Sequence, residues 1–258
     1  MSTLTLFTSH GQVATFTINR PDAGNAMTWA MYDALVDACE RVDAAPDVRA
    51  FLIRATGDAF CTGTDISQFA TFASREEGVG YERRLEACLS RLERVTAVTI
   101  AQVEGIAAGA GCAIALACDL RVCTDAARFG VPIARTLGNG LSYENCARLV
   151  DHFGIAIAKR MLIAGEFINV DEAAAAGIVS RKALPGDASR VVDELAAAIA
   201  RNAPLTIRAA KAALRQLSAR ESRASDIDRL VADCYASADF REGVSAFLSK
   251  RPPRFTGK

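Results

Sequence analysis

The sequence has few of the residues from which metal sites are built. Its 258 residues include two histidines, His10 and His152, and its eight cysteines form no C-x-x-C pair. Metal sites have denser ligand spacing than this, so we predict no metal. The cysteines lie mostly inside apolar segments, which favours buried free thiols in a reducing compartment. They are Cys39, Cys61, Cys88, Cys112, Cys118, Cys123, Cys146 and Cys234.

The sequence also lacks a net charge and a long apolar run. Thirty Lys and Arg residues balance thirty Asp and Glu residues, so no strong field would hold nucleic acid or an anionic membrane. The longest apolar stretch, Ile106 to Cys118, is shorter than the roughly 20 residues of a membrane span. The first residues lack the basic start and apolar run of a secretory signal. We therefore expect a cytoplasmic protein whose partner is a small molecule or another copy of itself.

Strands alternate with helices in the first half of the sequence. Residues 12–19 alternate apolar and polar side chains, as a half-exposed strand does, and residues 27–45 repeat apolar side chains at helical spacing. The same patterns predict strands at 48–55, 98–105 and 120–124, a helix at 76–95, and helices from residue 142 onward, with breaks at GEFIN, GIVSRKALPG and NAP. This order predicts an α/β fold, with no independent second domain.

The segment VEGIAAGAGCAIALACDLRV, residues 103–122, holds Gly105, Gly109 and Gly111 within seven positions. A strand leads into it and a helix begins within it, and the first N–H groups of a helix have no intrahelical acceptor and can hold an anion. The spacing does not match the G-x-G-x-x-G of dinucleotide-binding folds. The glycines are also consistent with close packing between segments alone.

A second glycine loop, AFCTGTDI, follows the strand predicted at 48–55. Both loops would then lie at the same end of neighbouring strands, where two N–H donors could converge on one oxygen. With these loops the sequence resembles the crotonase superfamily, the enoyl-CoA hydratase and isomerase family. The matching segments, in the family's order, are INRPDAGNAM, AFCTGTD, GIAAGAGCAIALACD and EGVSAFLSKR, and they cover essentially the whole chain.

The resemblance implies a spiral of strand-strand-helix units over residues 1–195 and a C-terminal helical region, residues 196–258, that trimerises. It implies an acyl-CoA thioester substrate and a homotrimer or dimer of trimers. It implies no separate cofactor, because CoA arrives as part of the substrate.

The resemblance also assigns site residues. The backbone N–H groups of Thr64 and Ala110 would be the oxyanion donors that stabilise a thioester enolate. The CoA pocket, largely main chain, maps to Asp22, Ala23, Gly24, Ala26, Thr62, Asp65 and Ile66. Phe247 and Lys250 match the family's C-terminal aromatic and lysine, which reach the nucleotide, often from a neighbouring subunit. The alternative for Lys250, which we favour less, is one charge of a solvated tail.

The sequence departs from the hydratases at their two water-activating glutamates, which are replaced by Ala113 and Ile133. Neither side chain can transfer a proton, so the usual hydration mechanism is not expected. The polar candidates nearby are Arg135, Asn139, Ser142, Tyr143 and Glu144. Glu144 is the only carboxylate among them, and we predict it as the acid–base group. It also fits the first turn of a helix capped by Ser142.

Two functions remain open at this point. The leading prediction is an enzyme that processes acyl-CoA thioesters through an enolate, in hydratase or isomerase chemistry. The alternative is a catalytically weak or inert member that binds acyl-CoA or assembles with partners. The missing glutamates favour the alternative, and the polar cluster at 135–144 favours the enzyme. Asp119 is predicted to be structural, and both histidines lie far from the two glycine loops in the sequence.

Overall fold

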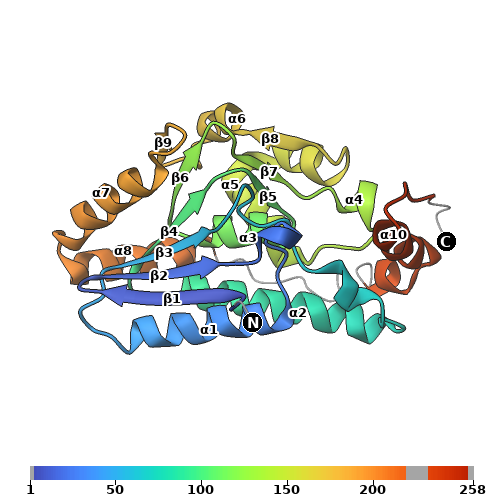
Figure 1. The fold of residues 1–258 in the computed structure, drawn as a ribbon, viewed down its shortest axis with the longest axis horizontal. Helices are drawn as coiled ribbons and strands as arrows, with labels where there is room; N and C mark the ends of the chain where they lie inside the picture. Colours follow the sequence, from blue (N-terminus) through green and yellow to red (C-terminus); the bar gives the residue numbers. More distant parts are fainter. Residues whose placement is uncertain (1–2, 219–231, 255–258) are drawn as a thin grey trace.

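The computed structural model describes residues 3–218 and 232–254. Its main element is a six-stranded sheet in the order β1-β2-β3-β4-β6-β9 (Figure 1). β1 runs antiparallel to β2, and the other neighbouring strands are parallel. The strands are β1 (Thr5–His10), β2 (Val13–Ile18), β3 (Ala50–Ala55), β4 (Val98–Val103), β6 (Leu120–Thr124) and β9 (Arg181–Ala183).

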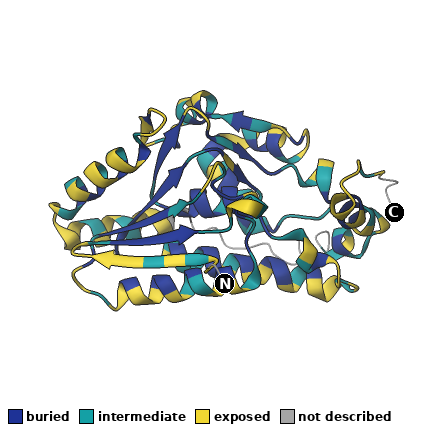
Figure 2. Ribbon diagram, viewed as in Figure 1, coloured by how far each residue is buried: buried dark blue, intermediate teal, exposed yellow. Residues whose placement is uncertain are grey.

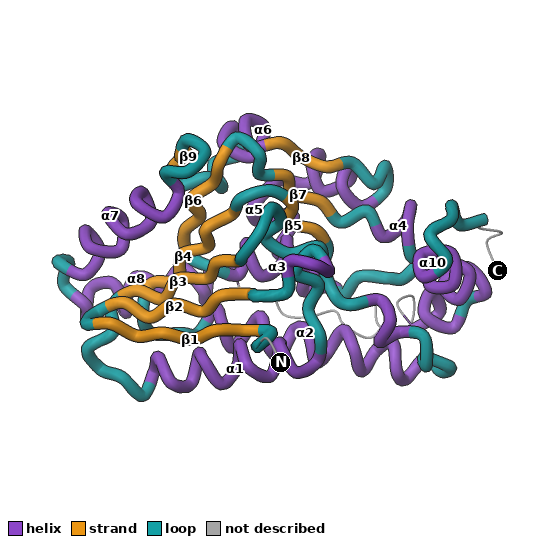
Figure 3. The backbone as a smooth tube through the Cα atoms, viewed as in Figure 1, coloured by secondary structure: helices purple, strands orange, loops and turns teal. Residues whose placement is uncertain are grey.

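A smaller sheet follows two of the inner strands, β4 and β6, along the chain. It contains β5 (Ile106–Ala108), β7 (Arg128–Gly130) and β8 (Phe167–Asn169). β4 leads into β5 and then α3 (Ala110–Ala117), and β6 leads into β7 and then α4 (Ile133–Thr136). This repetition of strand, strand and helix is the predicted spiral, and Figure 3 shows the order along the chain.

Helices cover both faces of the large sheet because the side chains of each strand alternate between the faces. On β3, Phe51 and Ile53 pack with α1 (Trp29–Asp43), α2 (Arg75–Glu93) and α3. Ala50 and Leu52 face the other way, toward α7 (Ala188–Ala200). β3, β4 and β6 are buried and β1 forms the exposed edge (Figure 2).

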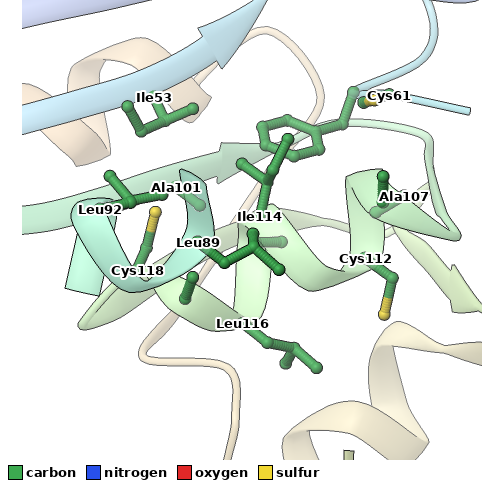
Figure 4. Close-up of a cluster of buried hydrophobic side chains, with 14 of the residues drawn as sticks. Ile53, Cys61, Leu89, Leu92, Ala101, Ala107, Cys112, Ile114, Leu116 and Cys118 are labelled. Atoms are coloured by element: carbon green, nitrogen blue, oxygen red, sulfur yellow. The ribbon is translucent and has the colours of Figure 1, made fainter. Parts of the chain in front are cut away.

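The remaining described elements are α5 (Tyr143–Leu162), α6 (Val170–Ala175), α8 (Pro204–Ser218) and α10 (Ala238–Leu248), with 3-10 helices η1 (Pro21–Ala23) and η2 (Ile66–Phe69). Helix α3 is apolar on all sides and lies in the core, as an all-apolar helix must. Its Cys112, Ile114 and Leu116 belong to the buried cluster of Figure 4. No described helix is long and apolar enough to cross a membrane.

The structure departs from the sequence predictions mainly at short strands. β1, β5, β7, β8 and β9 were not predicted, and four of them have three residues, which is too short for a period to be read. β8 and β9 fall on the predicted breaks GEFIN and GIVSRKALPG. Helix α5 is interrupted at Gly154, which has φ +73° and ψ 159°. The predicted boundary between residues 195 and 196 falls inside α7.

Candidate active site

The two glycine loops lie against each other beyond the carboxyl ends of β3 and β4. Cys61 of the first loop forms a bridge with Ala107 of β5. The Cys61 N–H donates to the Ile106 carbonyl oxygen over 3.0 Å, and the Ala108 N–H donates to the Cys61 carbonyl oxygen over 2.9 Å. These bonds hold the two loops at strand spacing.

Glycine is required at two positions by this close approach. A Cβ atom at Gly105 would lie 1.9 Å from the Asp58 carbonyl oxygen, and one at Gly111 would lie 2.1 Å from the Cys61 carbonyl oxygen. Gly105 also has φ +73°, which L side chains rarely adopt. The close-packing interpretation of the glycine segment is therefore confirmed at these two positions.

The backbone N–H groups of Thr64 and Ala110 lie where the loops meet. They follow Gly63 (φ +113°) and Gly109 (φ +51°), and a Cβ built on Gly63 would lie 3.8 Å from the Ala110 nitrogen. Within the described part of the chain, neither N–H donates to an acceptor. Ala110 is the first residue of α3, where the helix carries a partial positive charge. The structure thus brings both predicted donors to adjacent turns.

The Thr64 hydroxyl is fixed by two buried tyrosines. It lies 2.7 Å from the Tyr32 hydroxyl and 2.9 Å from the Tyr81 hydroxyl. Burial raises the pKa of both tyrosines well above the ordinary value, so they stay neutral hydrogen-bonding groups. This cluster holds the Thr64 side chain in place.

A cavity of about 40 Å³, here called the inner cavity, opens beside Ala110. Apolar side chains from α2, α3, α5 and the connections between them form most of its wall, namely Leu85, Leu116, Val131, Leu141 and Leu149. Ala113 and Ile133, the positions of the expected glutamates, both line it. Arg148 also lines it, but its guanidinium is paired with Glu86 (3.0 Å) and Glu93 (2.8 Å). The inner cavity is therefore small and mostly apolar.

Glu82 of α2 is the one carboxylate among the described residues that line the inner cavity. Its side chain accepts a hydrogen bond from the Ser142 N–H over 2.9 Å and another from the Tyr235 hydroxyl over 2.9 Å. Only 4% of the residue is exposed. Burial raises the pKa of Glu82 to about 7, although both hydrogen bonds act in the opposite direction. A titratable group therefore lines the cavity in which Ala113 and Ile133 replace the expected glutamates.

The sequence analysis missed Glu82, although α2 contained a signal. The buried residues of α2 recur every three or four positions, and Glu82 takes one of those positions, between Gly78 and Leu85. A carboxylate in the apolar stripe of an amphipathic helix is rare without a specific partner. Because charged residues such as Arg83 and Glu86 surround Glu82 in the sequence, its place in the apolar stripe is hard to recognise from the sequence alone.

The structure does not bring Glu144 to the inner cavity. Glu144 lines a second cavity of about 530 Å³, together with Tyr143, Asp151 and Lys211. The Ser142 hydroxyl caps α5 by accepting a hydrogen bond from the Asn145 N–H, as predicted. A catalytic role for Glu144 stays a prediction.

The other polar candidates divide between these places. Asn139 lines the inner cavity, whereas Arg135 packs beside Gly165. The Asp119 carboxylate accepts hydrogen bonds from the N–H and hydroxyl of Thr99 and pairs with Lys211, so its structural role is confirmed.

All eight cysteines are free, and six are buried. The described residues contain no group of side chains that could hold a metal ion.

The loops predicted to bind CoA are joined to each other. The Thr62 N–H donates to the Gly24 carbonyl oxygen over 3.1 Å. The Arg20 guanidinium bonds the Ala26 carbonyl oxygen over 3.0 Å and pairs with the Asp65 carboxylate over 2.7 Å. The structure therefore brings residues 22–26 beside residues 62–66.

Phe247 and Lys250 lie at the C-terminal end of α10. Phe247 is 54% exposed, and neither residue lines the inner cavity. The opposite side of α10 packs on η2, with the Phe240 and Phe69 ring centroids 6.1 Å apart. Their assignment to the nucleotide of CoA stays a prediction.

Comparisons with known proteins agree over the whole chain. The family model described as enoyl-CoA hydratase/isomerase matches residues 8–258. A 2,3-dehydroadipyl-CoA hydratase from Escherichia coli (strain K12) is 36% identical over 263 residues, covering 96% of this chain and 96% of that protein. A solved enoyl-CoA hydratase/carnithine racemase from Magnetospirillum magneticum has a TM-score of 0.80 and 29% identity, covering 100% of this chain and 97% of that one.

The fold itself is shared with a further solved structure. A methylmalonyl-CoA decarboxylase in complex with 2-nitronate-propionyl-CoA has a TM-score of 0.90 and 24% identity, covering 100% of both chains. This likeness concerns the fold alone.

Proposed function

The chain belongs to the enoyl-CoA hydratase/isomerase family, and we propose that it binds an acyl-CoA thioester and stabilises the enolate formed from it. The thioester oxygen would accept hydrogen bonds from the N–H groups of Thr64 and Ala110. One observation carries the proposal: two unused backbone donors stand on adjacent turns, and Ala110, which carries one of them, lines a mostly apolar cavity. One such donor is worth about 3–4 kcal/mol of transition-state stabilisation in another enzyme.

The acyl chain would occupy the inner cavity. A volume of about 40 Å³ holds only a few water-sized groups, so the acyl group is short. Arg148 is already paired with two glutamates, so it offers no free charge to a terminal carboxylate. We therefore propose a short, apolar acyl group as substrate.

The reaction we favour moves a proton within the acyl group rather than adding water. Ala113 and Ile133 line the inner cavity at the positions where the hydratases of the family orient water with glutamates. A shift of a double bond needs one acid–base group, whereas the family's hydration uses two. The same replacements favour the second candidate, an inert or weakly active acyl-CoA-binding member.

The remaining parts of the proposal concern binding and assembly. CoA would lie along residues 22–26 and 62–66, which present mainly backbone atoms. Phe247 and Lys250 would reach the nucleotide, and the C-terminal helices would build a homotrimer or a dimer of trimers. No separate cofactor is required for enolate chemistry on a thioester. Eight unpaired cysteines support a reducing, cytoplasmic location.

A pair of substitutions at Ala110 tests the proposal. Ala110→Pro deletes the N–H, while a proline suits the first position of a helix and removes no hydrogen bond of the described fold. Ala110→Gly keeps the N–H and is the matched control. Titration calorimetry with butyryl-CoA should show binding to the parent. In Ala110→Pro, catalysis should fall about 10²–10³-fold, and Ala110→Gly should stay within a few-fold of the parent.

Equal behaviour of the two Ala110 variants would remove the oxyanion assignment. Binding of butyryl-CoA by the parent, without turnover of any short acyl-CoA and without exchange of its α-hydrogens, would support the inert candidate instead.

A further inference from the structure

We propose that Glu82 is the catalytic acid–base residue of this chain and that it transfers the proton between carbons of the acyl group in the inner cavity. This inference rests on the proposed function. It names a residue on α2, a different element from those that carry Ala113, Ile133 and Glu144.

The position of Glu82 carries the argument first. It shares the inner cavity with Ala110, whose N–H is a proposed oxyanion donor, and with Ala113 and Ile133. The carbon next to a thioester carbonyl must lie close to the oxygen that the donors hold. A base for that carbon therefore has to line this cavity, and Glu82 is the only carboxylate among the described residues that does.

The hydrogen bonds of Glu82 leave it able to react. One carboxylate oxygen accepts from the Ser142 N–H and the other from the Tyr235 hydroxyl. The Ser142 side chain acts on it as a third hydrogen-bond partner. An ionised carboxylate has about four acceptor positions, so about one remains for a substrate hydrogen. The Tyr235 hydroxyl in turn accepts from the Asn139 side-chain amide over 3.2 Å. This chain fixes the orientation of the Glu82 carboxylate.

This series of hydrogen bonds ends at Asn139, whose side-chain oxygen makes no hydrogen bond with the described residues. Asn139 also lines the inner cavity, and its side-chain oxygen is buried without a hydrogen-bond partner among the described residues. A buried acceptor without a partner destabilises a protein unless a ligand or water satisfies it. The Asn139 side-chain oxygen could therefore accept a hydrogen bond from a molecule bound in the inner cavity.

The surroundings set the charge of Glu82 near neutral pH. Burial raises its pKa to about 7, and Glu86 on the same helix contributes in the same direction. Tyr81, Tyr235 and Cys146 on α5 also surround it, and they are neutral because their pKa values are all raised. Arg148 on α5 lines the same cavity, but its charge is paired with Glu86 and Glu93. Both forms of Glu82 are populated near pH 7, as a group that both takes and returns a proton requires.

The reaction balances with Glu82 alone. The carboxylate takes a proton from the carbon next to the carbonyl of a 3-enoyl thioester, and the electron pair of that C–H bond moves toward the carbonyl oxygen. The N–H groups of Thr64 and Ala110 hold the resulting dienolate oxygen. The protonated Glu82 then returns the proton to the fourth acyl carbon, and the double bond moves to the second and third carbons. No water, proton or electron is gained or lost.

A purely structural role makes a different prediction. Glutamine can accept from the Ser142 N–H and donate to the Tyr235 hydroxyl, so Glu82→Gln would preserve the fold if the residue only bridged these groups. The experiment therefore measures proton transfer and ligand binding separately. The probes are butyryl-CoA in D₂O, for exchange of its α-hydrogens, and 3-butenoyl-CoA, for conversion to crotonyl-CoA.

Glu82→Gln should lose about 10²–10⁴-fold in both rates and keep butyryl-CoA affinity within a few-fold. Glu76→Gln, the same substitution at an exposed position of the same helix, is the matched control and should equal the parent. Tyr235→Phe removes a hydrogen bond that lowers the pKa of Glu82. The pH near 7 at which the exchange rate is half-maximal should therefore move to a higher value. If Glu82→Gln does not fold, Glu82→Asp is measured instead, and it should retain the pH dependence and part of the exchange rate.

Exchange by Glu82→Gln within threefold of the parent would overturn this assignment alone. A tenfold or greater loss in Glu144→Gln, with Glu82→Gln unaffected, would overturn it in favour of Glu144. A parent protein that binds no butyryl-CoA would overturn the proposed function and this assignment with it.

Discussion

The two glycine loops are short segments of the polypeptide, whereas the wall of the inner cavity joins the start of α3 to elements that are distant in the sequence. The loops are two short segments whose proposed donors, on Thr64 and Ala110, are backbone atoms. The wall is made of side chains from four helices and their connections. Backbone donors persist for as long as the loop geometry does, whereas a side chain that transfers protons can be supplied from any element lining the cavity. On the proposed assignment, this chain keeps the backbone donors of the family's site and supplies its acid–base group from another element.

The largest effect should come from breaking the loops themselves. Gly111→Ala would place a Cβ atom 2.1 Å from the Cys61 carbonyl oxygen and force the two loops apart. We expect a loss of more than about 10³-fold in proton exchange, because the geometry of both donors depends on this contact, and a destabilisation of about 3 kcal/mol. Exchange assays and thermal melts measure the two effects. Parent-like exchange would show that the loops do not need this contact.

The next effect concerns the wall and the reaction it permits. Hydration of crotonyl-CoA should be slow, at least about 10²-fold below the roughly 10 s⁻¹ typical of enzymes, because Ala113 and Ile133 cannot activate water. The measurement is the loss of the enoyl absorbance with purified protein. The double variant Ala113→Glu with Ile133→Glu should raise the rate if the cavity keeps its shape. Fast hydration by the parent would show that another residue positions water.

A third effect tests the charge of Glu82 through stability. Its pKa is raised by burial from an ordinary value of 4.5 to about 7. The folded state therefore binds this proton more tightly than the unfolded state, so the stabilisation is complete below about pH 4.5 and is lost as the pH rises through 7. Relative to Glu82→Gln, the parent should lose on the order of 2–3 kcal/mol of unfolding free energy between pH 4.5 and 8. Denaturant titrations that show parallel pH profiles would contradict this.

The smallest effect compares two glycines of α2. A Cβ atom at Gly78 would lie 2.1 Å from the Tyr235 ring, whereas one at Gly80 would meet nothing within 4 Å. Gly78→Ala should displace Tyr235 from Glu82 and lower turnover about tenfold near pH 7, since a misplaced acid–base group loses only part of its effect. Gly80→Ala is the matched control and should stabilise the helix by about 0.5–1 kcal/mol without changing turnover. Equal turnover in both variants would show that the position of Tyr235 does not affect catalysis.

The sequence predicted the loops because they are local. The strands at 48–55 and 98–105 have clear apolar patterns, and the glycines of the two loops follow them within a few residues. Close approach of two backbones excludes every residue except glycine, as Gly105 and Gly111 show. A short run of letters therefore carries most of the information on this half of the site.

The wall could not be predicted in the same way because its contacts are distant in sequence. Tyr235 bonds Glu82 across 153 positions, and Ser142 does so across 60. Glu144 stood in the segment where the family places its second acid–base group, but the direction of α5 turns it toward the second cavity. Only the packing of α2 against α3 and α5 shows that Glu82 is buried beside Ala110.

A crystal structure of the protein with bound butyryl-CoA tests the central claim most directly. We predict that the thioester oxygen lies within about 3.2 Å of both the Thr64 and the Ala110 nitrogen atoms and that the second acyl carbon faces the Glu82 carboxylate. A thioester oxygen held by other donors, or an acyl chain that lies in the second cavity beside Glu144, would contradict the account.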